Sequence, residues 1–265
     1  MEARSTRIAL AVWSGLVIAF LWIPIVIICL YAFNSSNVQS WPIAGLTTKW
    51  FGPAIHDPAM QQSLWLSLEA GGLATAVAVV LGSTAALGLH RSRFFGREAV
   101  SFLFVLPIAL PGIITGMALN SFFVFWKLNF GLWTIVIGHA TFCVVVVYNN
   151  VLARVRRTPG SLVEASMDLG AGPFRTYLYV TLPTIATALI SGGLLAFALS
   201  FDEVIVTTFT AGAQNTLPLW IFGNIRLGQT LPETNVIVLL VLAATVIPVV
   251  LAQRLTRETG ILRSE

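Results

Sequence analysis

The chain of 265 residues has few charged residues and only two cysteines. Asp, Glu, Lys and Arg make up 10% of the sequence, whereas 57% is hydrophobic and the mean hydropathy is +0.86. This composition lies far from that of an ordinary soluble domain. Cys29 and Cys143 both fall within apolar runs, where free thiols act as small hydrophobic groups. They therefore indicate neither a disulfide framework nor a metal site.

The sequence also lacks the short motifs of common enzyme classes. It contains no G-x-x-x-x-G-K-[ST] phosphate loop, no H-E-x-x-H, no paired C-x-x-C and no G-x-S-x-G. Its three histidines lie in different segments, and only His139 is within an apolar run. Because polar groups are costly in a membrane, we interpret His139 as a hydrogen-bonding residue between helices in preference to a ligand or proton relay. Catalysis by this chain is not expected.

Long apolar runs are what the sequence has in abundance. A bilayer core about 30 Å thick requires about 20 apolar residues of helix. No small-x-small cleavage site follows the first run, so we expect it to be an uncleaved anchor. The predicted fold class is an all-α, polytopic membrane protein with six transmembrane helices. The six runs are Ile8 to Phe33, Leu64 to Leu89, Ala99 to Phe125, Leu132 to Ala153, Thr184 to Phe209 and Thr234 to Ala252.

The positive charges predict the orientation of these helices. Arginines precede the first run, separate the second from the third and the fourth from the fifth, and follow the sixth, which places them all on one side. The other side receives only Lys49, Lys127 and Arg226. By the positive-inside rule, both termini are expected to be cytoplasmic. The net charge of +4 thus follows from topology and requires no nucleic-acid partner.

The stretch from Glu164 to Pro183, in the longest predicted cytoplasmic loop, is unusually polar for this chain. Ser161-Leu-Val-Glu164 reads as a capping box that starts a short helix ending near Gly170. This helix is too short to span a membrane, and it carries Glu164 and Asp168 one turn apart on one face. Pro173 suits the first turn of a second short helix. These features support a solvated connector and a protein-binding surface equally.

The full spacing of this stretch resembles a known motif. Glu164-Ala165-Ser166, three residues, Gly170, nine residues and Val180-Thr-Leu-Pro183 resemble the EAA motif of bacterial ABC importer permeases, with Ser166 and Val180 as departures. Further segments along nearly the whole chain resemble the spermidine/putrescine-type branch of that family. They are Tyr31-Ala-Phe-Asn34, Thr48-Lys-Trp50-Phe51, Gly138-His-Ala-Thr-Phe142, Leu199-Ser-Phe-Asp202-Glu203-Val-Ile-Val206 and Thr216-Leu-Pro218.

The resemblance implies a type I importer fold with a coupling helix at about residues 161–175 that docks on an ATPase subunit. It assigns this coupling role to residues of the EAA-type segment, namely Glu164, Ala165, Ser166, Asp168 and Gly170. It also implies partners: a second homologous permease in a heterodimer, two ATPase subunits, and a periplasmic or lipid-anchored substrate-binding protein. ATP and Mg would be bound by the ATPase subunits, and this chain would hold no cofactor or metal.

The same resemblance implies a bacterial inner-membrane location and a division of the chain. Residues 1–63 would form the first helix and a periplasmic segment, residues 64–255 the permease core, and residues 256–265 a cytoplasmic tail. The implied substrate is a small cationic solute, foremost a polyamine such as putrescine or spermidine.

Two adjacent carboxylates, Asp202 and Glu203, fall in the outer half of the fifth apolar run. A carboxylate at the centre of a membrane helix costs roughly 2.5 kcal/mol or more, so it usually faces a cavity or a partner. One interpretation is a path for cations, with Ser200 on the same wall. The other is a structural pairing at a gate, with Arg226 or the second permease. Trp50 is interpreted as an interfacial anchor or as a contact for amines through its ring.

One departure bears on the substrate. Polyamine members of the family commonly carry an aspartate directly after the proline in the third span, where Gly112 follows Pro111 here. The alternative substrates are therefore a shorter diamine, or a compound with one amine, such as an amino acid derivative or an aminophosphonate. The prolines are expected to kink this helix, and Gly112 with Gly116 to form a packing face.

A third possibility from another class is an ion-coupled secondary transporter that uses Asp202 and Glu203 as ion carriers. It would leave the EAA-type loop without a role.

Overall fold

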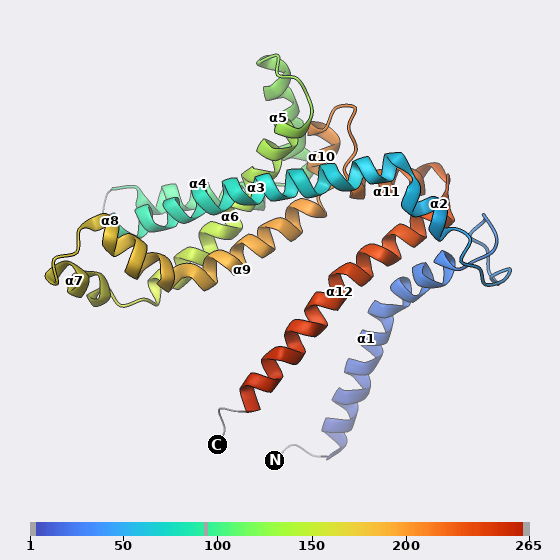
Figure 1. Ribbon diagram of the computed structural model, residues 1–265, viewed down its shortest axis with the longest axis horizontal. Coiled ribbons are helices and arrows are strands. Elements are labelled where there is room, and N and C mark those ends of the chain that lie inside the picture. Colours follow the sequence, from blue (N-terminus) through green and yellow to red (C-terminus); the bar gives the residue numbers. More distant parts are fainter. Residues whose placement is uncertain (1–3, 93–94, 262–265) are drawn as a thin grey trace. The chain divides into compact units, whose positions relative to one another are not determined.

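The computed structural model describes residues 4–92 and 95–261 (Figure 1). Within these ranges the regular structure is helical, apart from one isolated antiparallel bridge between Asn34 and Leu46. The chain divides into a terminal unit, residues 1–61 and 221–265, and a central unit, residues 62–220. In chain order the helices are α1 (Arg4–Ala32), α2 (Phe51–His56), α3 (Pro58–Arg91), α4 (Arg97–Ala109), α5 (Gly112–Phe125), α6 (Leu132–Arg156), α7 (Ser161–Asp168), α8 (Pro173–Thr176), the π-helix η1 (Tyr177–Thr181), α9 (Leu182–Phe201), α10 (Ile205–Thr210), α11 (Leu217–Leu227) and α12 (Leu231–Ile261).

In the terminal unit, α1 packs against α12, and the two helices run in opposite directions (Figure 1). The beginning of α1 and the end of α12 consequently lie at the same end of this unit. Large apolar side chains are exposed around α1, including Trp13 and Phe20. A helix that is apolar all round suits contact with lipid.

The connection between α1 and α2 is organised by Asn34, which is buried. Its carboxamide oxygen accepts hydrogen bonds from the backbone N–H groups of Ser36 and Ala44. Its backbone carbonyl accepts a bond from the indole Nε1 of Trp50 at 2.7 Å. The loop is therefore held by its own polar groups, as a connection outside the apolar helices requires.

The core of the central unit forms around α6, which packs against α4, α9 and α10. Tyr148 and Val147 of α6 are fully buried there with Ile185 of α9. Glycines allow the neighbouring helices to approach closely. At Gly82 of α3, an added Cβ would lie 2.8 Å from the carbonyl oxygen of Val144.

In the glycine pairs Gly71-Gly72 and Gly192-Gly193, three of the four glycines lie in close contact with another helix. An added Cβ would lie 3.1 Å from the Phe197 ring at Gly71, and 3.3 Å from Asn150 at Gly192. At Gly193 it would lie 3.4 Å from Val79. At Gly72 an added Cβ would meet nothing within 4 Å in the described part of the chain, so this glycine makes no such contact there.

The third predicted span is not one helix. The predicted continuous run from Ala99 to Phe125 is divided into α4 and α5, which are bent by 101° at the break. Leu110 has an extended backbone, with φ −79° and ψ 141°, because it precedes Pro111 and that ring excludes the helical conformation. The expected kink is thus confirmed at Pro111, whereas Pro107 lies inside α4 without ending it.

The fifth predicted span also differs from expectation. The run from Thr184 to Phe209 is interrupted, since α9 ends at Phe201 and α10 starts at Ile205. The Glu203 carboxylate accepts a hydrogen bond from the Val206 N–H, and the Glu203 carbonyl accepts one from the Thr207 hydroxyl at 2.6 Å. Such local side-chain bonds compete with a continuous helix.

Four described helices are long and apolar enough to cross a membrane, and the bent pair raises the number to five. They cover the first, second, fourth and fifth predicted runs, with α4 and α5 on the third. The sixth run, Thr234 to Ala252, lies in α12, whose apolar part among the described side chains, Leu231–Val246, is shorter than the roughly 20 residues of a complete span. The side chains of residues 247–252 lie outside the described part.

We predict that Gly82→Ala destabilises the central unit, because its Cβ would press on the backbone of α6. Overpacking of this kind costs about 1–3 kcal/mol. Gly72→Ala in the same helix is the matched control, since its Cβ meets nothing within 4 Å. Thermal unfolding in detergent, followed by size-exclusion chromatography, should show a lower midpoint for Gly82→Ala alone. Equal midpoints for the two variants would contradict the close approach of α3 and α6.

Candidate functional site

The EAA-type segment folds as α7, a corner, α8 and the π-helix η1, which continues directly into α9. The predicted short helix ending near Gly170 and the second short helix beginning at Pro173 are both present, as α7 and α8. The predicted capping box is wrong: Gly160 is the N-cap and Ser161 is the first helical residue, with no side-chain cap. The Glu164 N–H donates a hydrogen bond to the Gly160 carbonyl. The helix therefore begins one residue earlier than it would with Ser161 as the N-cap.

Gly170 ends α7 through a Schellman motif. Its φ of +83° lies in the left-handed region, which residues with a Cβ adopt only at a cost. The Gly170 N–H bonds the Met167 carbonyl, and the Ala171 N–H bonds the Ser166 carbonyl. Conformation explains the glycine here, because an added Cβ would meet nothing within 4 Å.

Ser166, a departure from the EAA pattern, connects the two short helices. Its hydroxyl lies 3.1 Å from the hydroxyl of Thr176 in α8, and Thr176 is buried. The other predicted coupling side chains of α7, Glu164, Ala165 and Asp168, are exposed. The structure thus gives Ser166 an internal role and leaves the remaining three available to another molecule.

Two exposed apolar side chains were not identified from the sequence. Leu169 is 89% exposed and Phe174 is 75% exposed, on either side of the corner between α7 and α8. The available signal was a pair of large apolar residues flanking Gly170 and Pro173 in an otherwise polar loop. Together with the exposed carboxylates, they make this corner a surface suited to contact with a protein.

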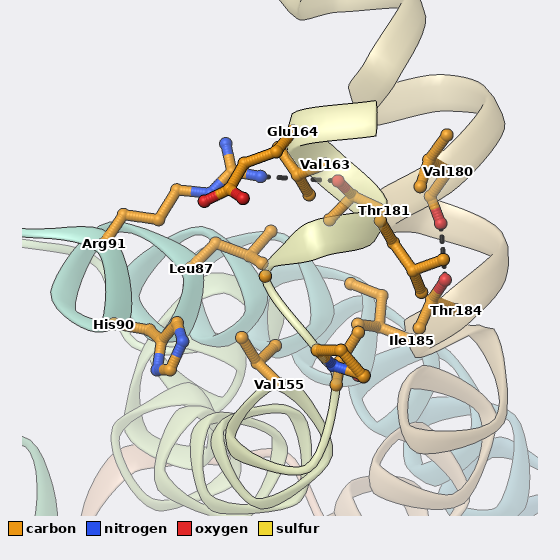
Figure 2. Close-up of a pocket in the computed structure, with 14 residues that line it drawn as sticks. Leu87, His90, Arg91, Val155, Val163, Glu164, Val180, Thr181, Thr184 and Ile185 are labelled. Atoms are coloured by element: carbon orange, nitrogen blue, oxygen red, sulfur yellow. Dashed lines mark hydrogen bonds between the residues drawn. The ribbon is translucent and has the colours of Figure 1, made fainter. Parts of the chain in front are cut away.

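Beneath α7 lies a cavity of about 250 Å³ (Figure 2). Figure 2 shows Arg91 extending from α3 to Thr181 of η1, whose hydroxyl lies 3.4 Å from a guanidinium nitrogen. Arg154 of α6 donates to the Thr184 carbonyl of α9 at 2.9 Å. The short helix α7 therefore sits over the ends of three long helices. The lining residues are Leu87, His90, Arg91, Val155, Thr158, Pro159, Gly160, Leu162, Val163, Glu164, Val180, Thr181, Thr184 and Ile185.

A second cavity, of about 210 Å³, lies at the two helix breaks. It contains the predicted site residue Glu203, whose side chain is half-buried. The Thr115 hydroxyl oxygen in its wall is buried and has no hydrogen-bond partner among the described residues. Thr115 could not be identified from the sequence, because nothing along the chain connects it with Glu203. The lining residues are Pro107, Ile108, Leu110, Gly112, Thr115, Phe142, Leu199, Glu203 and Val206.

The other predicted path residues are placed differently. Asp202 is the C-cap of α9 and is exposed. Ser200 is buried, and its hydroxyl lies 2.7 Å from His139 Nδ1. Trp50 belongs to the terminal unit, where Lys49 covers its ring at 4.2 Å and its indole N–H is hydrogen-bonded.

The side chains that line the second cavity are of kinds that can contact a cation. A carboxylate among apolar walls offsets part of the desolvation of an ammonium group, and the Phe142 ring and the Thr115 hydroxyl can contact the same group. Glu203 is the one charged residue in this lining, so an anion would meet no compensating charge. This arrangement suits a transient contact better than tight binding.

Long apolar helices, a carboxylate cavity at two helix breaks and an exposed short helix over three helix ends define the transmembrane subunit of a solute transporter. The chain belongs to the family described as "Binding-protein-dependent transport system inner membrane component", whose sequence profile matches residues 78–257. It is therefore a multi-pass inner-membrane permease.

Curated relatives and solved structures agree with this family. The chain is 38% identical to the putrescine transport system permease protein PotI of Escherichia coli (strain K12), over 85% of this chain and 82% of that protein. It is 31% identical to the spermidine/putrescine transport system permease protein PotC of the same organism, over 91% and 90%. A chain of a bacterial ABC transporter involved in the import of the acidic polysaccharide alginate shares the fold, with a TM-score of 0.67, 17% identity and coverage of 97% and 98%.

We predict that Gly170→Ala loosens the end of α7, because a left-handed backbone costs a residue with a Cβ about 1–2 kcal/mol. Amide hydrogen exchange of residues 169–171 should accelerate roughly tenfold. Gly172→Ala is the matched control, since Gly172 has φ −68° and open space around it. Gly170→Asn should fall between the two, because Asn tolerates this conformation. Unchanged exchange in Gly170→Ala would argue against the Schellman motif.

Proposed function

We propose that this chain is one of two permease subunits of an ATP-driven importer for a small cationic amine, with a polyamine such as putrescine or spermidine as the substrate. The cavity that contains Glu203 carries the proposal, because it offers one half-buried carboxylate at a place where two helices are broken. The names of the relatives PotI and PotC, which are putrescine and spermidine/putrescine permeases, support the same substrate class.

The proposed assembly contains a second, homologous permease, two ATPase subunits that bind ATP and Mg, and a periplasmic or lipid-anchored substrate-binding protein. Hydrolysis of ATP takes place in the partner subunits and not in this chain. Both termini, and with them α7 and α8, face the cytoplasm, since the arginines gather on that side of the predicted spans.

Within this assembly α7 is the coupling helix. Its exposed residues Glu164, Ala165 and Asp168 contact the ATPase subunit, while Ser166 and Gly170 hold the shape of the corner. Movement of the ATPase would displace α7, and the bonds from Arg91 and Arg154 to η1 and α9 would carry that displacement to three long helices.

A second candidate substrate is a compound with a single amine, such as an amino acid derivative or an aminophosphonate. The observation in its favour is that Glu203 is the one carboxylate in the cavity lining and that Gly112, directly after Pro111, adds none. A single carboxylate neutralises one ammonium group at a time. Thermal-shift screening of the substrate-binding protein with diamines and mono-amines would separate the two candidates.

We predict that Glu164→Arg weakens association with the ATPase subunit and leaves membrane insertion intact, because Glu164 is an exposed carboxylate of the proposed coupling helix. Recovery of the ATPase in detergent pulldown should fall several-fold, in the range expected for one interfacial charge pair. Glu98→Arg, at an exposed carboxylate in the first turn of α4, is the matched control. Equal recovery with both variants would remove Glu164 from the interface.

We further predict that Glu203→Gln lowers ATP-driven uptake of putrescine by about tenfold, because a hydrogen bond to a charged group contributes about 1.5–3 kcal/mol. Asp202→Asn should have a smaller effect, since Asp202 is exposed at the end of α9. Uptake of neutral analogues should change less than uptake of cations. The measurement is the initial rate of uptake by proteoliposomes that contain the complete transporter.

Expression, subunit assembly and basal ATP hydrolysis must match the parent in these variants. Glu98→Gln serves as the control, because it removes one carboxylate from α4 outside the cavity lining. If both Asp202→Asn and Glu203→Gln take up putrescine at the parental rate, the proposed role of these carboxylates in a cation path is wrong. If basal ATP hydrolysis changes while the subunits still assemble, the result would instead support a structural role of Asp202 and Glu203 at a gate.

A further inference from the structure

His139 of α6 bridges the break between α9 and α10. Its imidazole is buried, with 1% of its surface exposed. Nδ1 lies 2.7 Å from the Ser200 hydroxyl in the last turn of α9. Nε2 lies 2.8 Å from the Thr207 hydroxyl in α10. One side chain therefore holds both ends of a helix interruption whose residues are Asp202, Glu203 and Val204.

The hydrogen bonds that link Ser200, His139, Thr207 and Glu203 determine the tautomer of the imidazole. The single proton of the Thr207 hydroxyl is donated to the Glu203 carbonyl at 2.6 Å. Thr207 must therefore accept from His139 Nε2–H. In the neutral ring Nδ1 is then an acceptor, and it receives the Ser200 hydroxyl proton. His139 and Thr207 thus each use one donor and one acceptor.

The series ends at Glu203, which is fixed at two points. Its carbonyl accepts from Thr207, and its carboxylate Oε1 accepts from the Val206 N–H at 2.9 Å. These bonds restrain both the backbone and the side chain, so the carboxylate that lines the cavity has a defined place.

The rest of α6 holds α10 in the same way. Thr134 donates to the Thr210 carbonyl at 2.7 Å. An added Cβ at Gly138 would lie 3.2 Å from Thr210 and 3.3 Å from Val206. Because α10 is also held against α6 at Thr134 and Gly138, a change at His139 should act on the break and not on the placement of α10 as a whole.

We propose that His139 is the positioning residue that sets the place of Glu203 in the transport cavity, acting through Thr207 and Ser200. The proposal rests on the proposed function for its effect on transport. Its geometric part, the dependence of the Glu203 backbone on His139, stands on the hydrogen bonds alone.

The first experiment measures uptake of putrescine per ATP hydrolysed, with the complete transporter in proteoliposomes. His139→Leu and Thr207→Val should each lower this ratio about tenfold, as expected for a buried group left without its partner. His139→Gln should stay nearer to the parent, because its amide nitrogen can replace Nε2 as donor to Thr207. Cys143→Ala is the matched control, since Cys143 lies one turn further along α6 and bonds the Ala196 carbonyl. It should keep the parental ratio.

The second experiment does not depend on the substrate. In a chain with Cys29→Ala and Cys143→Ala, the thiol introduced by Glu203→Cys is labelled with a small methanethiosulfonate reagent. Adding Thr207→Val or His139→Leu should change the labelling rate several-fold, because the backbone at the break is released.

Unchanged labelling and an unchanged uptake ratio in assembled Thr207→Val would overturn the proposal. If His139→Leu fails to assemble, the isosteric variant Thr207→Val alone provides the test. Equal loss of the ratio in His139→Gln and His139→Leu would contradict the role of the Thr207 bond. Changed labelling combined with parental putrescine uptake by Glu203→Gln would keep the positioning role and reject the cation path.

Discussion

Backbone polar groups that leave a helix within an apolar region must find partners inside the protein, and the central unit is arranged around this constraint. The helix of the fifth apolar run is interrupted at Asp202, Glu203 and Val204, and α10 ends soon afterwards. The carbonyls exposed by these ends are bonded by side chains from three helices. Thr207 bonds the Glu203 carbonyl, Asn120 of α5 bonds that of Phe209, and Thr134 of α6 bonds that of Thr210. The interruption is therefore stable only in this packing, and the cavity that contains Glu203 depends on it.

The corner between α7 and α8, outside the long helices, also depends on hydrogen bonds within the protein for its shape. A short helix has little stability of its own, so its ends and its contacts decide whether it keeps a shape. The Schellman motif at Gly170 and the hydroxyl pair of Ser166 and Thr176 supply that shape. The exposed face is then available to a partner, while the inner face covers a cavity bounded by α3, α6 and α9. A rigid corner over the ends of long helices is what mechanical coupling to a partner requires.

Several features were accessible from the sequence because they depend on neighbouring residues. The long runs predicted α1, α3, α6 and α9, and the proline at position 111 predicted the kink that separates α4 from α5. The interpretation of His139 as a hydrogen-bonding residue between helices is confirmed by its bonds to Ser200 and Thr207. The capping box at Ser161 failed, however, because Gly160 was equally able to start the helix and local spacing could not separate the two.

The amino-acid sequence by itself determined that this chain is a helical membrane protein and where its short helix between the fourth and fifth apolar runs lies, and it singled out Asp202 and Glu203 as candidate carboxylates. Those conclusions follow from hydropathy, local spacing and residue type, which are properties of adjacent positions. Only the tertiary structure decided where the fifth helix breaks, that Glu203 shares a cavity with Thr115, and that His139 joins the two sides of the break. The physical reason is sequence separation: the partners of His139 lie 61 and 68 positions away, and no pattern along the chain records which distant hydroxyl an imidazole will meet.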